Sequence, residues 1–460
     1  MKRYLIVAVA AMLGMASAAS NYVYILTGQS NSLGAVKGSP ASSETLDRYS
    51  SHGLLWNGNM KRDSGECFEL NPSWDGVSPQ LPAYDGSLCM GPEYGFSYMM
   101  HHRGWHTEGG DKLYVVKASL DGGGNKFWMP GAPAYKSLSR TVKSALAKLG
   151  QAKVQGLLYL QGESDKGDEV SAAPARFQGL HARLKKEVGK GLKYAVAGEC
   201  ATWNGSEEED AAGNTTAKLM YALAKKNKSI GWVRTRDLTK ITSGDSMGVH
   251  YDGKSQITIG SRYAYAVAVQ EKLPMGSVRS DAPEVSLDSS AAWWGGKMPK
   301  EDDVACWDVA AANVSDRLCR NMSVGGLLVE DPFRGEVSIA PDGEKSTVLR
   351  IGKQGIALQQ GNLALACDLH LRSDQTWRLE SGRKLLIGTP ESPVALSGSA
   401  VITIQAPADA LLELHLAAAP ECEWNMPGEQ PQVLATIGGK PAQLVKQGSL
   451  YKLECAAEKS

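Results

Sequence analysis

A serine follows an apolar stretch near the start of the chain. Residues 22–26 read YVYIL, and Ser30 follows in the segment TGQSNS. A tight turn after a strand is where a nucleophilic hydroxyl stands at the edge of a sheet, although a free serine needs a neighbouring base to take its proton. Most serines in such turns only close the turn. Ser30 is therefore a candidate nucleophile whose assignment depends on finding its base.

A suitable base occurs much later in the chain. His250 lies in the polar segment GDSMGVHYDG, just before a predicted helix from Ser255 to about Glu271. Asp245 precedes the histidine and could orient the imidazole and stabilise its cation. Ser30, His250 and Asp245 would together form a triad for acyl transfer.

Acyl transfer also needs hydrogen-bond donors for the oxyanion. The segment DGGGN contains Gly122 and Gly123, whose backbone N–H groups carry no neighbouring side chain that obstructs them. Gln161 or Ser164, both in QGESD, could add a side-chain donor. The glycines could equally form a flexible loop or an anion-binding nest, but no phosphate-binding motif follows them.

The elements that must position these residues are strands of a parallel sheet. From residue 21 to about 272, short apolar runs alternate with helical patterns, which is typical of a parallel sheet covered by helices. Ligands bind at the carboxyl ends of such strands, so the segments carrying the candidate residues should meet on one rim. The predicted strands are 22–26, 112–119, 156–160, 193–198 and 231–235.

Taken together, these segments resemble the SGNH hydrolase superfamily, in the branch of sialate O-acetylesterases and related carbohydrate acetylesterases. The resemblance implies a flavodoxin-like three-layer α/β/α domain over residues 21–275, no metal or other cofactor, and hydrolysis of O-acetyl esters on sugars. The substrate would be an acetylated glycan, such as one carrying sialic acid or a xylan. The matching segments are TGQSNS (27–32), GPEYGF (91–96), the glycine block ending at Trp128, LQGESD (160–165) and GVHYDGKSQITIGSRYA (248–264).

The resemblance also implies roles for single residues. Ser30 would be the nucleophile and His250 the base, with Gly122 or Gly123 as the backbone oxyanion donor and Gln161 beside the oxyanion. Asn31, Trp128 and Glu163 are expected to contact substrate. Trp128 could stack on a sugar ring or equally be a buried aromatic. Glu163 and Asp165 could be an acid–base pair or a salt-bridged support for Arg262 or a neighbouring loop.

One position departs from the family pattern. The family usually has its acid three residues before the histidine, where this chain has Met247, while Asp245 stands five residues before. Asp245 could still reach His250 from a bulged loop, a backbone carbonyl could orient the histidine, or catalysis could be weakened. We favour Asp245, since loss of the orienting acid can cost about 10⁴ in rate. The alternative function is a weakened homologue that acts as a glycan-binding or surface scaffold protein.

The second half of the chain has a different pattern. A linker at residues 276–295 leads into short alternating runs about ten residues apart, such as VLRIG, NLALACDLHL and AVITIQ. This spacing predicts a β-rich accessory domain over residues 296–460, either a sandwich or a β-solenoid, and we favour the solenoid. It contains no candidate catalytic constellation.

Composition limits the possible partners and the location. The chain has 49 Lys+Arg and 49 Asp+Glu, so no net charge favours nucleic acid or an anionic membrane as partner.

Residues 1–20 combine a Lys-Arg start, an apolar run and Ala16-Ser17-Ala18, which is typical of a cleavable signal peptide. We therefore expect a secreted or periplasmic protein, with the oligomeric state left open.

The eight cysteines contain no C-x-x-C pair, so a metal site is not expected. In an oxidising compartment, Cys67 with Cys89 and Cys306 with Cys319 could form local disulfides, or the thiols could be buried as small hydrophobic groups.

Overall fold

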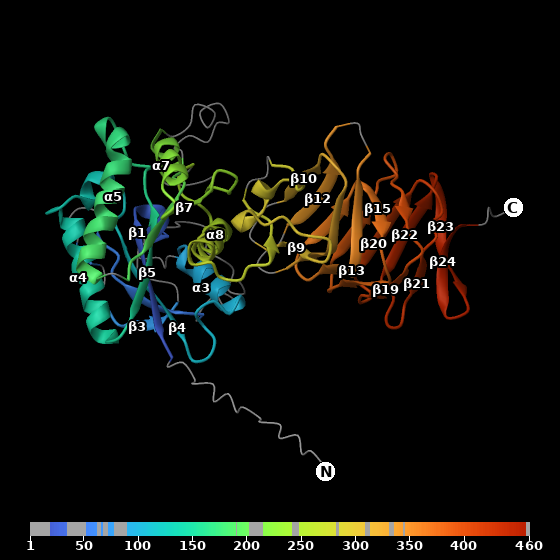
Figure 1. The fold of residues 1–460 in the computed structure, drawn as a ribbon, viewed down its shortest axis with the longest axis horizontal. Helices are drawn as coiled ribbons and strands as arrows, with labels where there is room; N and C mark the ends of the chain where they lie inside the picture. The colour runs from blue at the N-terminus through green and yellow to red at the C-terminus, as the bar shows by residue number, and fades with distance from the viewer. Residues whose placement is uncertain are drawn as a thin grey trace, which may run out of the picture.

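The computed structural model is an elongated molecule in which an α/β half is followed by a β-rich half (Figure 1). The first eighteen residues of the expected signal peptide and Asp245 lie outside the residues that it describes. Within those residues, no helix is long and apolar enough to cross a membrane. The described residues are 19–34, 52–61, 66–67, 72–77, 90–189, 191–201, 215–241, 248–281, 285–308, 313–330, 335–343 and 346–456.

The first half is built on one sheet with the strand order β3-β2-β4-β1-β5-β6-β7. All neighbours are parallel except β2 and β3. The run β4-β1-β5-β6-β7 has the flavodoxin-like order, which agrees with the predicted fold class. The strands are β1 (Asn21–Gly28), β2 (Leu54–Asn57), β3 (Trp74–Gly76), β4 (Lys112–Ser119), β5 (Lys153–Leu160), β6 (Tyr194–Gly198) and β7 (Ile230–Val233).

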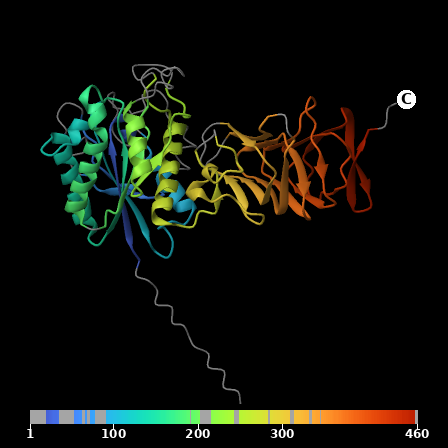
Figure 2. The same cartoon turned by 45° about the horizontal axis from the view of Figure 1, so that its top comes forward.

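Helices cover both faces of this sheet (Figures 1 and 2). Side chains of β1 alternate between the faces: Val23 and Ile25 join the core under α4, α5 and α7, while Tyr24 and Leu26 join the core under α3 and α8. Because both faces are buried, β1 reads as a continuous apolar run. The helices are α1 (Ser30–Leu33), α3 (Glu93–His102), α4 (Pro133–Leu149), α5 (Asp168–Val188), α7 (Thr215–Lys226) and α8 (Gly253–Glu271), with a 3₁₀ turn η1 (Asn125–Trp128).

The central strands end side by side. Gly28, the last residue of β1, pairs with Ser119 at the end of β4 and with Leu160 at the end of β5. The segments that follow these three strands are therefore neighbours in space, as the sequence predicted.

The second half is a β-solenoid, as favoured from the sequence. Successive coils stack parallel strands so that equivalent apolar residues lie above one another, for example Leu363 on Leu385 and Leu385 on Leu412. An antiparallel meander of β22, β23 and β24 forms the far end. The strands are β9 (Val304–Trp307), β10 (Val314–Leu318), β11 (Met322–Val329), β12 (Glu336–Pro341), β13 (Val348–Leu358), β14 (Asn362–Leu365), β15 (Asp368–Leu371), β16 (Gln375–Leu379), β17 (Lys384–Ile387), β18 (Leu396–Ser397), β19 (Val401–Gln405), β20 (Leu411–Leu416), β21 (Glu423–Asn425), β22 (Gln432–Ile437), β23 (Lys440–Gln447) and β24 (Leu450–Cys455).

The expected linker belongs to the start of this solenoid. Its strand β8 (Ser277–Val278) pairs in parallel with β9, and two 3₁₀ turns, η2 (Ser290–Ala292) and η3 (Trp294–Gly296), follow. A buried ionic contact joins the two halves: the guanidinium of Arg103, which follows α3, donates to the carboxylates of Asp308 and Glu330.

The possible disulfide between Cys306 and Cys319 is absent, since both thiols are free. Cys306 is buried and donates to Glu330 at 3.1 Å, whereas Cys319 is exposed and donates to Asp342 at 3.3 Å. Cys67 is also free, and Cys89 lies outside the described residues.

Candidate active site

Ser30 stands at the first position of α1, directly above the end of β1. Gly28 makes this turn possible: its φ is +140°, and a Cβ there would lie 1.9 Å from the Leu160 carbonyl oxygen. Only glycine tolerates both the conformation and the approach to β5. Gln29 then donates its backbone N–H to the same carbonyl at 3.0 Å. Ser30 is thereby held at the shared rim of β1 and β5, and it is 3% exposed.

The first amide of the GQSN segment ties this turn to the segment after β5. The Gln29 Oε1 accepts from Gln161 Nε2 at 2.7 Å and from the backbone N–H groups of Gly162 and Ser164, both at 3.2 Å. Its Nε2 donates to Ser164 Oγ at 3.3 Å. Gln29 therefore organises the turn of the QGES segment.

The second amide ties the turn to the segment of His250. The Asn31 Nδ2 donates to the Val249 carbonyl at 3.0 Å, and its Oδ1 accepts from the Tyr251 N–H at 3.1 Å. Val249 and Tyr251 flank His250, so Asn31 fixes the backbone of the candidate base beside the candidate nucleophile. The remaining Nδ2 hydrogen goes to Glu163 at 2.7 Å. Asn31 is 1% exposed and fully bonded inside the protein. It therefore positions other residues, whereas the sequence led us to expect a contact with substrate.

His250 lies just before α8, whose first turn is capped by the Asp252 carboxylate accepting from the Ser255 N–H at 2.8 Å. Burial lowers the pKa of His250 to about 4, so the imidazole is neutral at neutral pH. Within the described part of the chain, its buried Nδ1 has no hydrogen-bond partner. A neutral imidazole has one unprotonated ring nitrogen that can accept a proton, which is the state that a general base requires.

Donors for an oxyanion are available on the same rim. Among the described residues, the backbone N–H groups of Ser30, Gly122 and Gly123 donate to no partner. The sequence led us to expect that Gln161 donates to the oxyanion. Its Nε2 instead donates to Gln29 Oε1 at 2.7 Å and to the Gly123 carbonyl at 2.8 Å, so no side-chain donor is left. Gln161 instead holds the glycine turn against the turn of Ser30.

Trp128 follows the glycine segment and is buried. Its indole Nε1 donates to Gln161 Oε1 at 2.9 Å, its carbonyl accepts from Arg183 at 2.6 Å, and it is 2% exposed. A sugar needs an accessible aromatic face, so the structure supports the alternative of a core aromatic for Trp128.

Glu163 is buried behind Asn31 and accepts from Asn31 and from the Ala201 N–H at 3.2 Å. Burial raises the pKa of Glu163 to about 7, and the hydrogen bond from Asn31 opposes that rise. At 3% exposure it supports Asn31 instead of contacting substrate. Arg262 pairs with Asp237 at 2.6 Å and not with Glu163 or Asp165. Asp165 accepts from the backbone and side-chain N–H groups of Asn125 at 2.8 Å, which agrees with support of a neighbouring loop.

Two residues near the site were not singled out from the sequence. Gln29 was quoted within its motif, but its bridging role depends on residues more than 130 positions away. Asn59 follows the short strand β2, which was also missed, and accepts from the Ser119 N–H at 3.2 Å while being 2% exposed. The only available signal for Asn59 was a polar residue three positions after the apolar LLW run.

The GPEYGF segment acts through packing. Glu93 forms a buried ion pair with Lys117 of β4 at 2.8 Å. At Gly95, a Cβ would lie 1.8 Å from the Ile257 carbonyl oxygen, so α3 and α8 touch backbone to backbone. This segment therefore sets the position of α8, which directly follows His250.

Comparison with known proteins identifies the family to which the chain belongs. The α/β half defines an esterase-type hydrolase domain, since residues 20–269 match the family model described as carbohydrate esterase, sialic acid-specific acetylesterase. The chain belongs to this family, which confirms the resemblance inferred from its motifs. Among curated proteins, none matches the chain.

Several solved structures are similar to about half of this chain. A protein from Arabidopsis thaliana is 17% identical over 54% of this chain and 98% of its own, with a TM-score of 0.41. NanS is 13% identical over 55% of this chain and 98% of its own, with a TM-score of 0.42. A carbohydrate acetylesterase from Xanthomonas citri is 14% identical over 56% of this chain and 59% of its own, with a TM-score of 0.38.

Proposed function

We propose that this protein is a secreted serine esterase that removes O-acetyl groups from carbohydrates, with Ser30 as nucleophile, His250 as base and Asp245 as the orienting acid. Membership of the carbohydrate acetylesterase family supports O-deacetylation of glycans in general. The observation that carries the finer proposal is the double hydrogen bond of Asn31 to the residues on either side of His250.

In the first step, the Ser30 hydroxyl attacks the acetyl carbonyl carbon while His250 accepts its proton. The carbonyl oxygen becomes an oxyanion, which the N–H groups of Ser30 and of Gly122 or Gly123 stabilise. The tetrahedral intermediate collapses, the bond to the sugar oxygen breaks, and His250 returns the proton to that oxygen. The products are the free sugar hydroxyl and an acetyl-Ser30 ester.

Water then repeats the cycle. His250 removes a proton from water, the hydroxide attacks the acetyl-enzyme, and the proton passes to Ser30 Oγ as acetate leaves. These steps require a neutral His250, which agrees with its lowered pKa. Each step also passes through an imidazolium cation, which an acid partner at Nδ1 would stabilise.

Asp245 is the proposed partner of His250 Nδ1. Among the described residues this buried nitrogen lacks an acceptor, and Asp245 precedes His250 by five positions in the sequence. A buried donor without a partner costs about 1–3 kcal/mol, so a nearby carboxylate would improve stability as well as catalysis. A backbone carbonyl in the same role remains the alternative that mutation of Asp245 distinguishes.

The test is hydrolysis of p-nitrophenyl acetate by the wild type, Ser30→Ala and Asp245→Asn, together with acetate release from O-acetylated sialoglycans and acetylated xylan. We expect Ser30→Ala to abolish hydrolysis and Asp245→Asn to lower kcat by about 10²–10⁴. The glycan that releases more acetate identifies the substrate. Unchanged hydrolysis in Ser30→Ala would refute the mechanism.

A second candidate is a weakened homologue that binds glycans without efficient hydrolysis. The unpartnered Nδ1 of His250 within the described residues is the observation that favours it. A wild-type protein that binds glycans but releases no acetate from any of the three esters would support this second candidate.

A further inference from the structure

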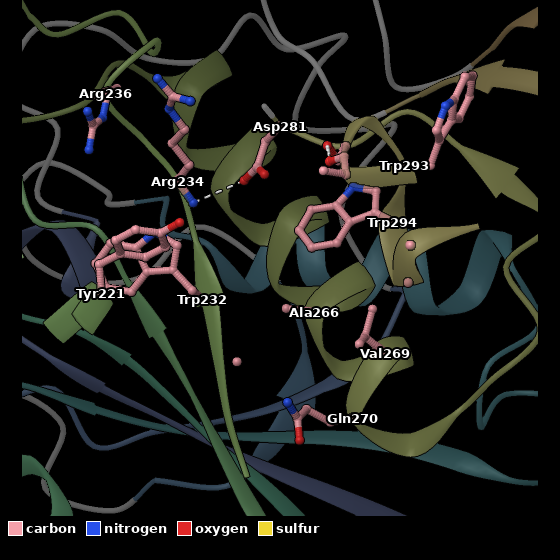
Figure 3. A pocket seen from close by; sticks show the side chains of 15 residues that line it. Tyr221, Trp232, Arg234, Arg236, Ala266, Val269, Gln270, Asp281, Trp293 and Trp294 are labelled. Carbon is pink, nitrogen blue, oxygen red and sulfur yellow. Dashed lines mark hydrogen bonds between the residues drawn. The ribbon is translucent and has the colours of Figure 1, made fainter. Parts of the chain in front are cut away.

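A cavity of about 560 Å³ lies at the junction of the two halves. None of the residues that are hydrogen-bonded around Ser30 lines this cavity. Lining residues come from α7, β7 and the last turns of α8 on the side of the α/β half, and from residues 280–281 and 291–296. In Figure 3, Tyr221 and Trp232 lie on one side and Trp294 on the other, with Gln270 below them. Its volume is within the range of small-molecule sites, and domain junctions are a common place for such sites.

The lining offers aromatic rings to a ligand. Tyr221 of α7 lies next to Trp232 of β7, with ring centroids 5.6 Å apart and planes inclined by 50° (Figure 3). Five large apolar side chains are exposed among the described residues, and two of them, Tyr221 at 46% and Val269 at 36%, line this one cavity. Accessible aromatic and aliphatic groups in a concave site favour a ligand with apolar faces.

The same cavity contains polar groups around these apolar surfaces. Gln270, Ser280, Asp281 and Arg236 belong to its lining. Trp294 also lines it, is 9% exposed, and has an indole N–H that donates to no described residue. That N–H is shielded from solvent, so a ligand hydroxyl would instead bond to the more accessible side chains of Gln270 and Arg236. Apolar faces combined with hydroxyl groups are the chemistry of a sugar ring.

Part of the cavity lining is bonded to a residue that follows a strand of the sheet carrying Ser30. Arg236, after the end of β7, donates its Nε to the Glu199 carboxylate at 2.9 Å, and Glu199 directly follows β6. Two residues later, the Ala201 N–H donates to Glu163, which in turn accepts from Asn31. Hydrogen bonds and the short backbone segment 199–201 thus connect Arg236 at the edge of the cavity to Asn31, the residue next to Ser30.

We propose that this cavity is a second carbohydrate-binding site, which holds a sugar unit of an oligosaccharide chain away from the unit that carries the acetyl ester. Binding itself does not require the esterase reaction. The placement of the bound chain across the rim toward Ser30 rests on the proposed function. The substrate would accordingly be an oligosaccharide or polysaccharide and not a free monosaccharide.

The test measures binding of non-acetylated probes to the full chain by isothermal titration calorimetry. The probes are xylohexaose and a hexamer of sialic acid, each compared with its own monosaccharide. Tyr221→Ala removes an exposed ring, and Val269→Trp places a large side chain at the exposed position of α8 to fill the cavity. Tyr451→Ala, which removes a partly exposed tyrosine from the far end of the solenoid, is the matched control.

We expect one hexasaccharide to bind at least tenfold more tightly than its monosaccharide. Tyr221→Ala and Val269→Trp should each weaken that binding by about tenfold, because loss of one aromatic contact is worth about this factor. The control should stay within twofold. Failure of both hexasaccharides to bind, or equal binding by all variants, would overturn the proposal.

Hydrolysis of p-nitrophenyl acetate on the same samples separates this proposal from the esterase function. This small ester cannot reach both sites, so Tyr221→Ala and Val269→Trp should leave its kcat/KM within twofold of the wild type. An active esterase with no oligosaccharide binding refutes only the second site. An inactive protein whose binding depends on Tyr221 refutes only the esterase.

Discussion

The side-chain amide of Asn31 donates to the carboxylate of Glu163 at 2.7 Å while the same amide holds both neighbours of His250. One buried residue therefore connects the nucleophile turn, the base and a carboxyl group whose pKa is raised to about 7. The stability and activity of the proposed catalytic site should therefore depend on the hydrogen bonds of Asn31, although Asn31 itself is too buried to touch a substrate.

Replacing Asn31 with alanine should damage both stability and activity. Asn31→Ala leaves the Val249 carbonyl and the Tyr251 N–H without these bonds, so we expect a loss of about 1–3 kcal/mol in the free energy of unfolding. Because His250 would lose its fixed backbone, kcat for p-nitrophenyl acetate should fall by about 10²-fold. Asn227→Ala, which removes a bond to Ser229 away from the site, is the control. Wild-type kcat in a folded Asn31→Ala would contradict the positioning role.

The pH profile should report the buried state of His250. Its pKa is lowered to about 4 by burial, and the neutral form is the active base. The value of kcat/KM should therefore fall only when the pH decreases toward about 4, well below the ordinary histidine pKa near 6.5. An acid limb at or above pH 6.5 that moves down in Asp245→Asn would show instead that a carboxylate beside the imidazole outweighs burial.

Glu163 should make stability depend on pH. Its folded pKa of about 7 is above the ordinary 4.5, so the folded state holds a proton that the unfolded state releases. This contribution is fully present below pH 4.5 and is lost as the pH rises to about 7, with a size of about 3 kcal/mol. Glu163→Gln cannot lose the proton, so its free energy of unfolding should exceed that of the wild type increasingly between pH 4.5 and 7.

Urea unfolding of both proteins across this pH range measures the difference. Glu429→Gln, at an exposed position, is the matched control and should follow the wild type at every pH. Parallel curves for the wild type and Glu163→Gln would mean that Glu163 is ionised in the folded protein at all these pH values.

Two helical glycines should respond in opposite ways to a methyl group. In Gly95→Ala the new Cβ meets the Ile257 carbonyl oxygen at 1.8 Å, so α3 and α8 must separate, at a cost of about 1–3 kcal/mol. In Gly179→Ala of α5 the nearest atom is the flexible end of Arg183 at 3.1 Å, so better helix propensity should stabilise by up to about 1 kcal/mol. Thermal unfolding of both variants measures the contrast. Equal shifts in Tm would contradict the close helix contact.

Much of the architecture could be predicted from local pattern. The five predicted strands of the first half correspond to β1, β4, β5, β6 and β7, because strands buried on both faces are continuous apolar runs. The short strands β2 and β3 were missed, since four and three residues carry too little periodicity. The regular spacing of the second half indicated a solenoid because each coil repeats the same apolar positions.

The sequence by itself determined the family and the candidates Ser30, His250 and Gly122 or Gly123, because strand ends and glycine turns are local features. Only the tertiary structure decided what Asn31, Gln161, Trp128 and Glu163 do. Their partners lie far away in the chain, as with Asn31 and Val249, which are 218 positions apart. A polar side chain looks the same in the sequence whether it faces a substrate or a buried acceptor. Folding satisfies buried groups from the inside, and this requirement makes these four residues supports of the site.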